Sequence, residues 1–284
     1  MVNVEVYGNF IDPDTQRVLI ILEELDLKYN LHQVSQNDNL QIQPFGNLPV
    51  LKYDDRIVFQ SRSILRYIAK NNVELNDLFG GTDVDMWLEV ESQTYNPIVS
   101  NIVNEKLFKK WRGEKSDGEV VKKLVEDLER VLDVYDKRLS SFPYIGGKEF
   151  SMADISHIPY TNYLLKCGYK ELFKKRPNVY KWLKRILKRD SFEFILQESE
   201  QYRKKELTKN EESKQEPKEE PKEEPKEEPK EEPKDEPKHE HKDEPKEEPK
   251  EEPKEKLNEE SKKEFKEKMK EERVRERKVK SLQK

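Results

Sequence analysis

The sequence predicts a mixed α/β domain, then an all-helical domain, then a disordered and highly charged tail. Residues 1–78 alternate strand-like and helix-like patterns, and residues 83–205 show helical periodicity broken only by turns. From residue 206 onward apolar side chains almost disappear. We divide this tail into a repetitive linker, 206–254, and a charged segment, 255–284, whose composition favours a helix.

Composition separates the tail from the rest of the 284 residues. Of 60 acidic and 55 basic residues, 29 and 24 follow residue 205, so 31 of each precede it and the net charge of −5 belongs to the tail. The single Cys167 excludes an internal disulfide and is typical of a reducing compartment. No apolar run approaches the ~20 residues that span a bilayer, and the start lacks a signal-peptide pattern. We therefore expect a cytoplasmic protein with no membrane contact.

The first domain begins with a strand over residues 2–7, "VNVEVY". A helix follows in "DPDTQRVLIILEELDL", where Asp12 is the expected N-cap and Pro13 the first helical residue. "KYNLHQVS" predicts a second strand, and "LPVLKYD" with "RIVFQ" predicts a hairpin that turns at Asp54–Asp55. "SRSILRYIAKNN" predicts an amphipathic helix, with Ser61 as a candidate N-cap.

The second domain begins with a helical segment over 83–112 that Pro97 should bend or interrupt. A long helix follows over 118–141, and we expect one face of it to be buried. Ser151 and Asp154 have the spacing of a capping box, and Pro177 starts a later helix. The predicted buried face of the long helix consists of Val120, Leu124, Leu128, Val131, Leu132 and Tyr135.

The linker repeats the unit "EEPK" over residues 217–253. A proline at nearly every fourth position removes a backbone donor from each turn, which excludes a continuous α-helix. With almost no apolar side chain to offset the entropy of ordering, we predict a disordered and extended tract. The basic end, "RVRERKVK", is expected to be solvated rather than to bind nucleic acid.

Several blocks resemble glutathione transferases, most closely the phi class of plants. They are "VEVYGNF", "TQRVLIILEELDLKY", "QPFGNLPVL", "FQSRSILRYIA", "MWLEVESQTYNPIVS" and "SMADIS" with "NVYKWLKRI", in this order over residues 2–200. The resemblance implies a thioredoxin-like domain followed by an all-helical domain, usually in a dimer. It also implies a cis peptide bond before Pro49, with the main chain of Leu48 holding the cysteinyl part of glutathione as an added strand would.

The resemblance implies thiolate chemistry, in which a hydroxyl near a helix N-terminus favours the glutathione anion. The phi-class serine position falls on Asp12, and an ionised carboxylate accepts hydrogen bonds but donates none. Asp12 can therefore be read as a helix cap. Thr15, one turn into the helix, and Tyr7, at the end of the first strand, are the alternative hydroxyl donors.

For the γ-glutamyl end of glutathione, Gln60 and Ser61 match the Glu-Ser pair of the family. Gln60 keeps an acceptor and lacks the charge of Glu. Asn47 matches a family Gln near the ligand backbone and can equally be a turn residue. The segment "VSQNDNLQIQ" is shorter than the phi pattern and has no basic residue, so we expect weakened binding of the glycyl carboxylate.

The second substrate, a small hydrophobic electrophile, would lie against the helical domain. Tyr95 and Ile98 are the first candidates for this cleft, and core packing is the alternative for both. The wider aromatic and apolar set also includes Trp87, Phe108 and Trp111.

We therefore expect a dimeric glutathione transferase with an atypical and weakened active site, using glutathione as co-substrate and no metal or other cofactor. The alternative is a non-catalytic scaffold resembling the gamma subunit of eukaryotic elongation factor one, which joins such a domain to a Lys/Glu/Pro-rich linker. In either case the tail is expected to bind a protein partner.

Overall fold

The computed structural model describes residues 3–34, 42–72 and 81–212. The chain divides into two compact units, 1–207 and 208–284, and the fold set out below is that of the first. The "EEPK" tract, the charged end and the short loop after the second strand lie outside the described residues, and those predictions remain predictions.

A four-stranded sheet forms the centre of the first domain, in the order β2-β1-β3-β4. Its strands are β1 (Val4–Gly8), β2 (Asn30–Gln33), β3 (Val50–Tyr53) and β4 (Arg56–Phe59). β1 pairs in parallel with β2 and antiparallel with β3, which pairs antiparallel with β4. The turn at Asp54 has a positive φ of 51°, a conformation that Asp tolerates better than most residues. The predicted strands and hairpin are therefore confirmed.

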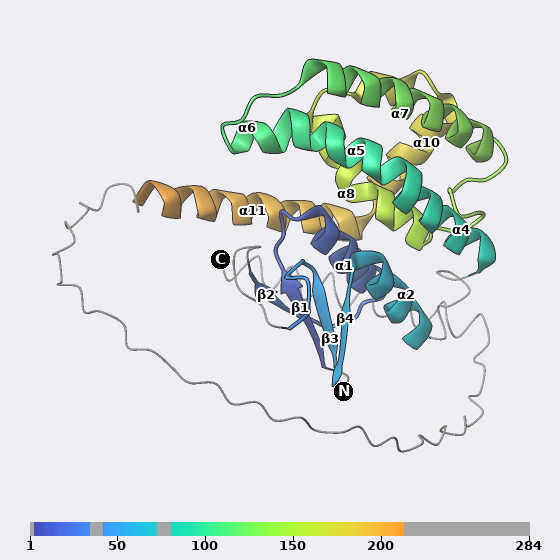
Figure 1. Cartoon of the computed structure of the whole chain (residues 1–284). Coiled ribbons are helices and arrows are strands. Elements are labelled where there is room, and N and C mark those ends of the chain that lie inside the picture. Colours follow the sequence, from blue (N-terminus) through green and yellow to red (C-terminus); the bar gives the residue numbers. More distant parts are fainter. Residues whose placement is uncertain (1–2, 35–41, 73–80, 213–284) are drawn as a thin grey trace, which may run out of the picture. The chain divides into compact units, whose positions relative to one another are not determined.

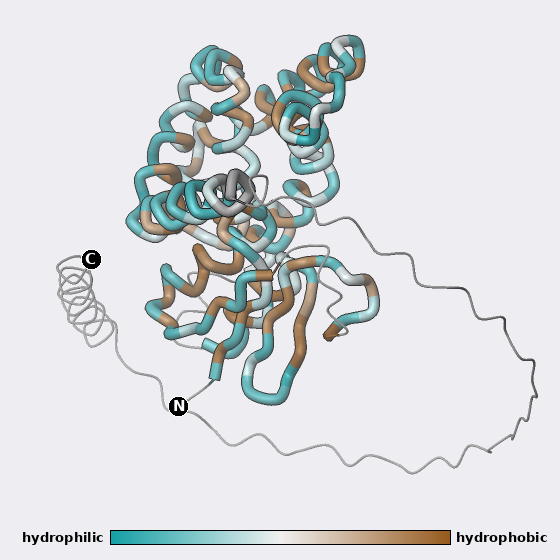
Figure 2. Tube along the Cα trace, turned by 90° about the vertical axis from the view of Figure 1, so that its left-hand side faces the viewer, coloured by the Kyte–Doolittle hydropathy of each residue, from teal (hydrophilic) through white to brown (hydrophobic). Residues whose placement is uncertain are grey.

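Two helices pack on this sheet, α1 (Pro13–Glu24) and α2 (Ser61–Asn71) (Figure 1). Val4 and Val6 alternate with half-buried residues along β1 and join the apolar residues of both helices in one core. In Figure 2 runs of hydrophobic residues follow the strands, while the outer helices alternate between polar and apolar positions. The apolar positions that predicted these strands and helices are therefore the positions buried in the core.

The helical domain opens with a long helical segment that Pro97 modifies without breaking. α4 (Thr82–Val90) continues through a π-helical turn over Glu91–Tyr95 into α5 (Asn96–Val103), where Pro97 occupies the first turn. A π turn shifts the hydrogen-bond ladder by one residue, so the missing N–H of proline is accommodated. A second π turn, Asn104–Phe108, leads to α6 (Lys109–Trp111).

The predicted helices follow in order as α7 (Gly118–Leu139), α8 (Met152–Lys166) and α10 (Pro177–Ile186). The short helix α9 (Lys170–Lys174), between α8 and α10, was not predicted. The capping box of Ser151 and Asp154 is present at the start of α8. The prediction that Val120 lies on the buried face of α7 is wrong. Val120 sits in the first turn, where it is 45% exposed, and Val121 is buried instead.

The last described helix, α11 (Asp190–Glu212), extends past the predicted domain boundary (Figure 1). Residues 206–212, which we assigned to the linker, are helical because their composition favours a helix and the first proline of the repeat comes only at Pro217. Within the part of the chain that the structure describes, no helix is both long enough and apolar enough to traverse a bilayer.

Candidate active site

The strand register brings three chain segments to one end of the sheet. Tyr7 pairs with Val50, and Val50 pairs with Phe59. Three chain segments therefore lie next to one another: the one that leaves β1, the one that enters β3 and the one that leaves β4. Two of them lead directly into the N-termini of α1 and α2, where unpaired N–H groups favour anions.

The segment that enters β3 contains a cis peptide bond between Leu48 and Pro49, as the resemblance implied. Gln43 is buried and braces this loop from inside: its Nε2 donates to the carbonyl of Asn47 over 2.9 Å, and its Oε1 accepts from the N–H of Phe45 over 2.7 Å. Asn47 is exposed, Leu48 is half-buried and Pro49 is buried. The loop thus presents Asn47 and Leu48 at the surface.

The segment that leaves β4 has a strained residue at the entry to α2. Gln60 adopts φ 70° and ψ 117°, which a residue with a side chain rarely occupies. The prediction that Ser61 caps this helix is wrong, because Gln60 holds the cap position without a side-chain bond and Ser61 is the first helical residue. The hydroxyl of Ser61 instead donates to Oδ1 of Asp14 over 2.6 Å, which joins the two helix N-termini.

Asp12 caps α1, as the sequence predicted. Its Oδ2 accepts from the N–H of Thr15 over 2.7 Å and from the Thr15 hydroxyl over 2.6 Å. The side-chain oxygen of Asn9 accepts from the N–H of Asp12 over 2.9 Å and holds the loop. Burial, and next the nearby charge of Asp14, raise the pKa of Asp12 to about 6.

Thr15 lies beneath the loop and is fully buried. Its hydroxyl is engaged by Asp12. A Cβ atom on Gly8 would lie 2.4 Å from the Thr15 hydroxyl oxygen, so only glycine at position 8 leaves room for this side chain. In this arrangement the Thr15 hydroxyl is directed at Asp12.

Tyr7 is directed away from the helix N-termini. Its hydroxyl donates to Oε2 of Glu5 over 3.1 Å, toward the start of β1, and its ring stacks on His32 with centroids 4.6 Å apart. Burial, and then the bond to Glu5, raise the pKa of the Tyr7 hydroxyl. A hydroxyl that stabilises a thiolate needs the opposite shift, so this geometry favours a packing role.

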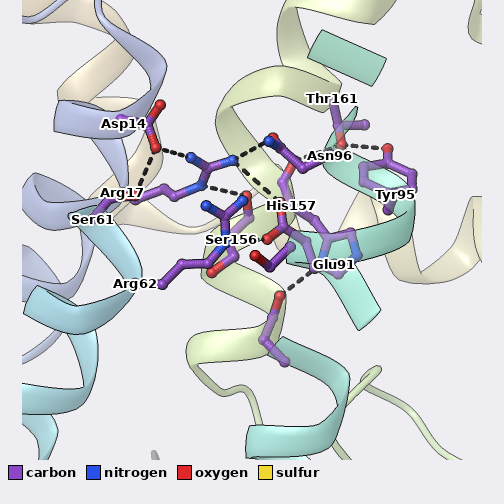
Figure 3. Close-up of polar contacts among 12 residues, drawn as sticks. Asp14, Arg17, Ser61, Arg62, Glu91, Tyr95, Asn96, Ser156, His157 and Thr161 are labelled. Atoms are coloured by element: carbon purple, nitrogen blue, oxygen red, sulfur yellow. Dashed lines mark hydrogen bonds and ion pairs between the residues drawn. The ribbon is translucent and has the colours of Figure 1, made fainter. Parts of the chain in front are cut away.

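A buried ion network behind the site was missed by the sequence reasoning (Figure 3). Arg17, on α1, is fully buried and pairs with Asp14 and, over 3.2 Å, with Glu91 from the helical domain. Burial alone would raise the pKa of Asp14, but Arg17 and the bond from Ser61 lower it below the ordinary value. Asp14 is therefore held as an anion between the helix N-termini.

The network continues into the helical domain. Arg62 contacts Glu91 over 2.6 Å, and the Arg17 guanidinium donates to Asn96 over 2.8 Å and to the carbonyl of Ser156 over 2.9 Å. Charges buried this deeply require partners, and Arg17 and Glu91 have them, whereas Nη2 of Arg62 has no hydrogen-bond partner among the described residues. The only sequence signal was the i,i+3 spacing of Asp14 and Arg17, which is too common to identify a site.

The predicted second-substrate residues fall in different environments. Tyr95 is fully buried, with its hydroxyl 2.7 Å from that of Thr161, so its ring is not open to a ligand in this structure. Ile98 is half-buried on α5. Trp87 is buried and packs edge-on against Tyr135.

An aromatic cluster lies closer to Asp12. Tyr163 donates to the carbonyl of Ile11 over 2.8 Å, and its ring packs against Phe108 and Trp111. Trp111 is 48% exposed, and the guanidinium of Arg203 lies 4.8 Å from its ring centroid. Phe108 and Trp111 belong to the wider set predicted for the second-substrate cleft, whereas Tyr163 was not among the candidates.

Comparison with known proteins identifies the family. Residues 2–70 match the model of the glutathione S-transferase N-terminal domain, and residues 98–190 match that of the C-terminal domain. A glutathione S-transferase of Hyoscyamus muticus is 34% identical over 202 residues, which cover 66% of this chain and 95% of that protein. The chain belongs to the glutathione S-transferase family. Glutathione S-transferase F13 of Arabidopsis thaliana is 32% identical, with 66% and 93% covered.

Solved glutathione S-transferases share the fold. Apo glutathione S-transferase III has a TM-score of 0.64 at 34% identity, with 68% of this chain and 95% of that chain covered. Glutathione transferase F2 of Populus trichocarpa has a TM-score of 0.66 at 31% identity, with 70% and 99% covered. The thioredoxin-like domain and the helical domain are therefore those of a phi-class-like glutathione S-transferase.

Proposed function

We propose that this transferase conjugates the thiol of glutathione to small hydrophobic electrophiles in the cytoplasm. The observation that carries the proposal is the convergence of the cis Leu48–Pro49 loop and two helix N-termini at one end of the sheet. Main-chain groups can hold a peptide there, and the helix ends favour its carboxylate.

In this proposal the main chain of Leu48 pairs with the cysteinyl residue of glutathione, and Asn47 and Pro49 shape that edge. Gln60 and Ser61 bind the γ-glutamyl end, where Ser61 begins α2. Asp14 adds a negative charge next to Ser61 that Gln60 lacks, and this charge suits the ligand ammonium.

The electrophile would contact the helical domain. Ile98 and the exposed ring of Trp111 supply apolar surface, with Phe108 and Tyr163 behind it. The apolar wall favours aromatic or aliphatic acceptors, and Arg203 above Trp111 favours those with electron-rich groups.

The test combines calorimetry with turnover. We expect the purified full chain to bind glutathione at millimolar concentration or below and to consume it with a chlorinated aromatic acceptor. Absence of binding at millimolar glutathione would refute the proposal. If the protein binds glutathione but turns over none of a panel of acceptors, it would be a carrier of glutathione and not an enzyme.

We also propose a homodimer. Phe45 is 67% exposed, packs edge-on against Phe59, and lies near the edge strand β4, where Ile57 is also exposed. An exposed apolar patch of this kind usually marks an interface. Phe45→Glu should shift sedimentation from dimer to monomer, whereas Val134→Glu, at an exposed apolar position on α7, should not.

A scaffold role is the second candidate, and one observation favours it. Asp12 stands at the catalytic serine position and is tied to Thr15 in the manner of an ordinary helix cap. The fold would then serve to dock proteins, with the tail as a further binding segment. A pulldown that recovers translation factors or synthetases, together with no glutathione binding, would support it.

A further inference from the structure

Only one of the two carboxylate oxygens of Asp12 accepts hydrogen bonds from the described residues. Its Oδ2 accepts both bonds from Thr15, while Oδ1 has no hydrogen-bond partner among the described residues. Asn9 fixes the backbone on the other side, because its side-chain oxygen accepts from the N–H groups of Ile11 and Asp12. Asp12 is half-buried at the sheet end where the Leu48 loop enters β3.

Asp12 and Asp14 lie two residues apart and differ in their partners. Asp14 is ionised, pairs with Arg17 and accepts from the Ser61 hydroxyl, whereas Asp12 accepts hydrogen bonds only from the uncharged Thr15. Two neighbouring carboxylates in such different surroundings divide their roles: the paired one stays ionised and the other exchanges a proton. The direction of the two pKa shifts, Asp14 down and Asp12 up to about 6, agrees with this division.

We propose that Asp12 is a general base that removes the proton of the glutathione thiol as the sulfur attacks the electrophile. This inference rests on the proposed function, which places the cysteinyl residue at Leu48. In the mechanism that the family resemblance implies, a hydroxyl stabilises a thiolate that has already formed. Here Asp12 would instead remove the proton during the attack.

The step balances without a further reactant. The S–H bond breaks and its proton moves to Oδ1 of Asp12, while a sulfur lone pair forms the bond to the electrophilic carbon. With an activated aryl halide, the halide leaves with the electrons of its bond to carbon. The proton on Asp12 then passes to water and restores the base.

The groups around Asp12 support a proton acceptor at neutral pH. Asp14 and Arg17 face it from α1, and Tyr160 and Tyr163 face it from α8. Burial is the main cause that raises the pKa of both tyrosines, so they stay neutral and do not compete for the proton. Below about pH 6 Asp12 is protonated and the base is lost.

The decisive variant is Asp12→Asn, which keeps the size and the helix cap and removes the base. We expect kcat/KM to fall by about 10²–10⁴-fold, as is typical for loss of a general base, with glutathione affinity in calorimetry unchanged or higher. The wild-type kcat/KM should fall as pH drops through about 6, and the variant should lack this limb. Asp117→Asn, the same change at the cap of α7, should alter neither quantity.

A second measurement needs no turnover. The ultraviolet absorbance of bound glutathione reports its thiolate, and the negative charge of Asp12 should keep the thiol pKa at or above its free value. Asp12→Asn should lower that pKa. A low thiol pKa in the wild type that the variant leaves unchanged would overturn the inference while glutathione binding stands. Failure of the wild type to bind glutathione would instead refute the proposed function.

Discussion

The hydroxyl of Ser61 donates a 2.6 Å hydrogen bond to Oδ1 of Asp14, and this bond joins the first turn of α2 to the first turn of α1. The two helices start at the same end of the sheet, and Ser61 directly follows the strained Gln60. Arg17 also contacts this Oδ1 atom of Asp14. The candidate glutathione site is therefore braced by a network that reaches the helical domain through Glu91.

The first prediction concerns Ser61. Ser61→Ala removes the hydroxyl that holds Asp14, the anion that we propose faces the ligand ammonium. A hydrogen bond to a charged group contributes about 1.5–3 kcal/mol, so we expect the Kd for glutathione to rise by up to about 10- to 100-fold. Isothermal calorimetry measures it. Ser63→Ala, at an exposed position on the same helix, is the control and should bind as the wild type does. Equal affinities for the two variants would show that the bond between Ser61 and Asp14 does not support glutathione binding.

The second prediction concerns Asp154, which is fully buried at the start of α8. Its carboxylate accepts from the N–H groups of Ile145 and Ser151, from the Ser151 hydroxyl and from the indole of Trp182. Asp154→Ala leaves these donors unsatisfied, so we expect a loss of about 3 kcal/mol or more in denaturant unfolding. Asp117→Ala, at an exposed cap, should cost about 1 kcal/mol, and equal losses would contradict the burial argument.

The third prediction is a pH dependence of stability. His157 is fully buried, with Nε2 3.0 Å from the Tyr135 hydroxyl and Nδ1 2.6 Å from the carbonyl of Ala153. Burial lowers its pKa from 6.5 to about 4, so the unfolded chain binds the proton first and stability falls as pH drops from 6.5 to 4. The loss should reach about 3 kcal/mol at pH 4.

The variant His157→Gln isolates this effect, because glutamine keeps an acceptor for Tyr135 and does not titrate. Chemical denaturation at several pH values should give a shallower decline for the variant than for the wild type. Burial raises the pKa of Asp154, which acts in the opposite direction and is common to both proteins. Parallel curves would show that His157 does not contribute.

The fourth prediction concerns the tail. The buried residues of the described chain all precede residue 200, and α11 ends at Glu212. A chain that ends after residue 212 should therefore keep the melting temperature of the full chain to within about 2 °C, since surface changes rarely exceed ±0.5 kcal/mol. A larger drop in differential scanning calorimetry would show that residues 213–284 stabilise the fold.

The order of elements followed from local patterns in the sequence. Each of these patterns acts within a few residues: the alternation in "VNVEVY" and "LPVLKYD", the helical spacing in α1 and α7, and the prolines Pro13 and Pro177. The structure has the predicted strands and helices at these places. The Asp12 cap and the Ser151–Asp154 capping box are local in the same sense. Three details that the sequence missed, Val120, the cap of α2 and the end of α11, lie at helix ends, where local signals are weakest.

The sequence by itself therefore predicted most of the strands and helices. Its resemblance to glutathione transferases implied the cis bond before Pro49 and placed an aspartate, Asp12, at the position of the family serine. Only the tertiary structure decided that Ser61 contacts Asp14 and that Arg17 pairs with Glu91, 74 residues away. The first pair depends on how α1 and α2 pack within the first domain, and the second on how the two domains pack. A buried charge takes whichever partner that packing brings within reach. A pattern that spans a few residues carries no information about a partner that lies far away in the sequence.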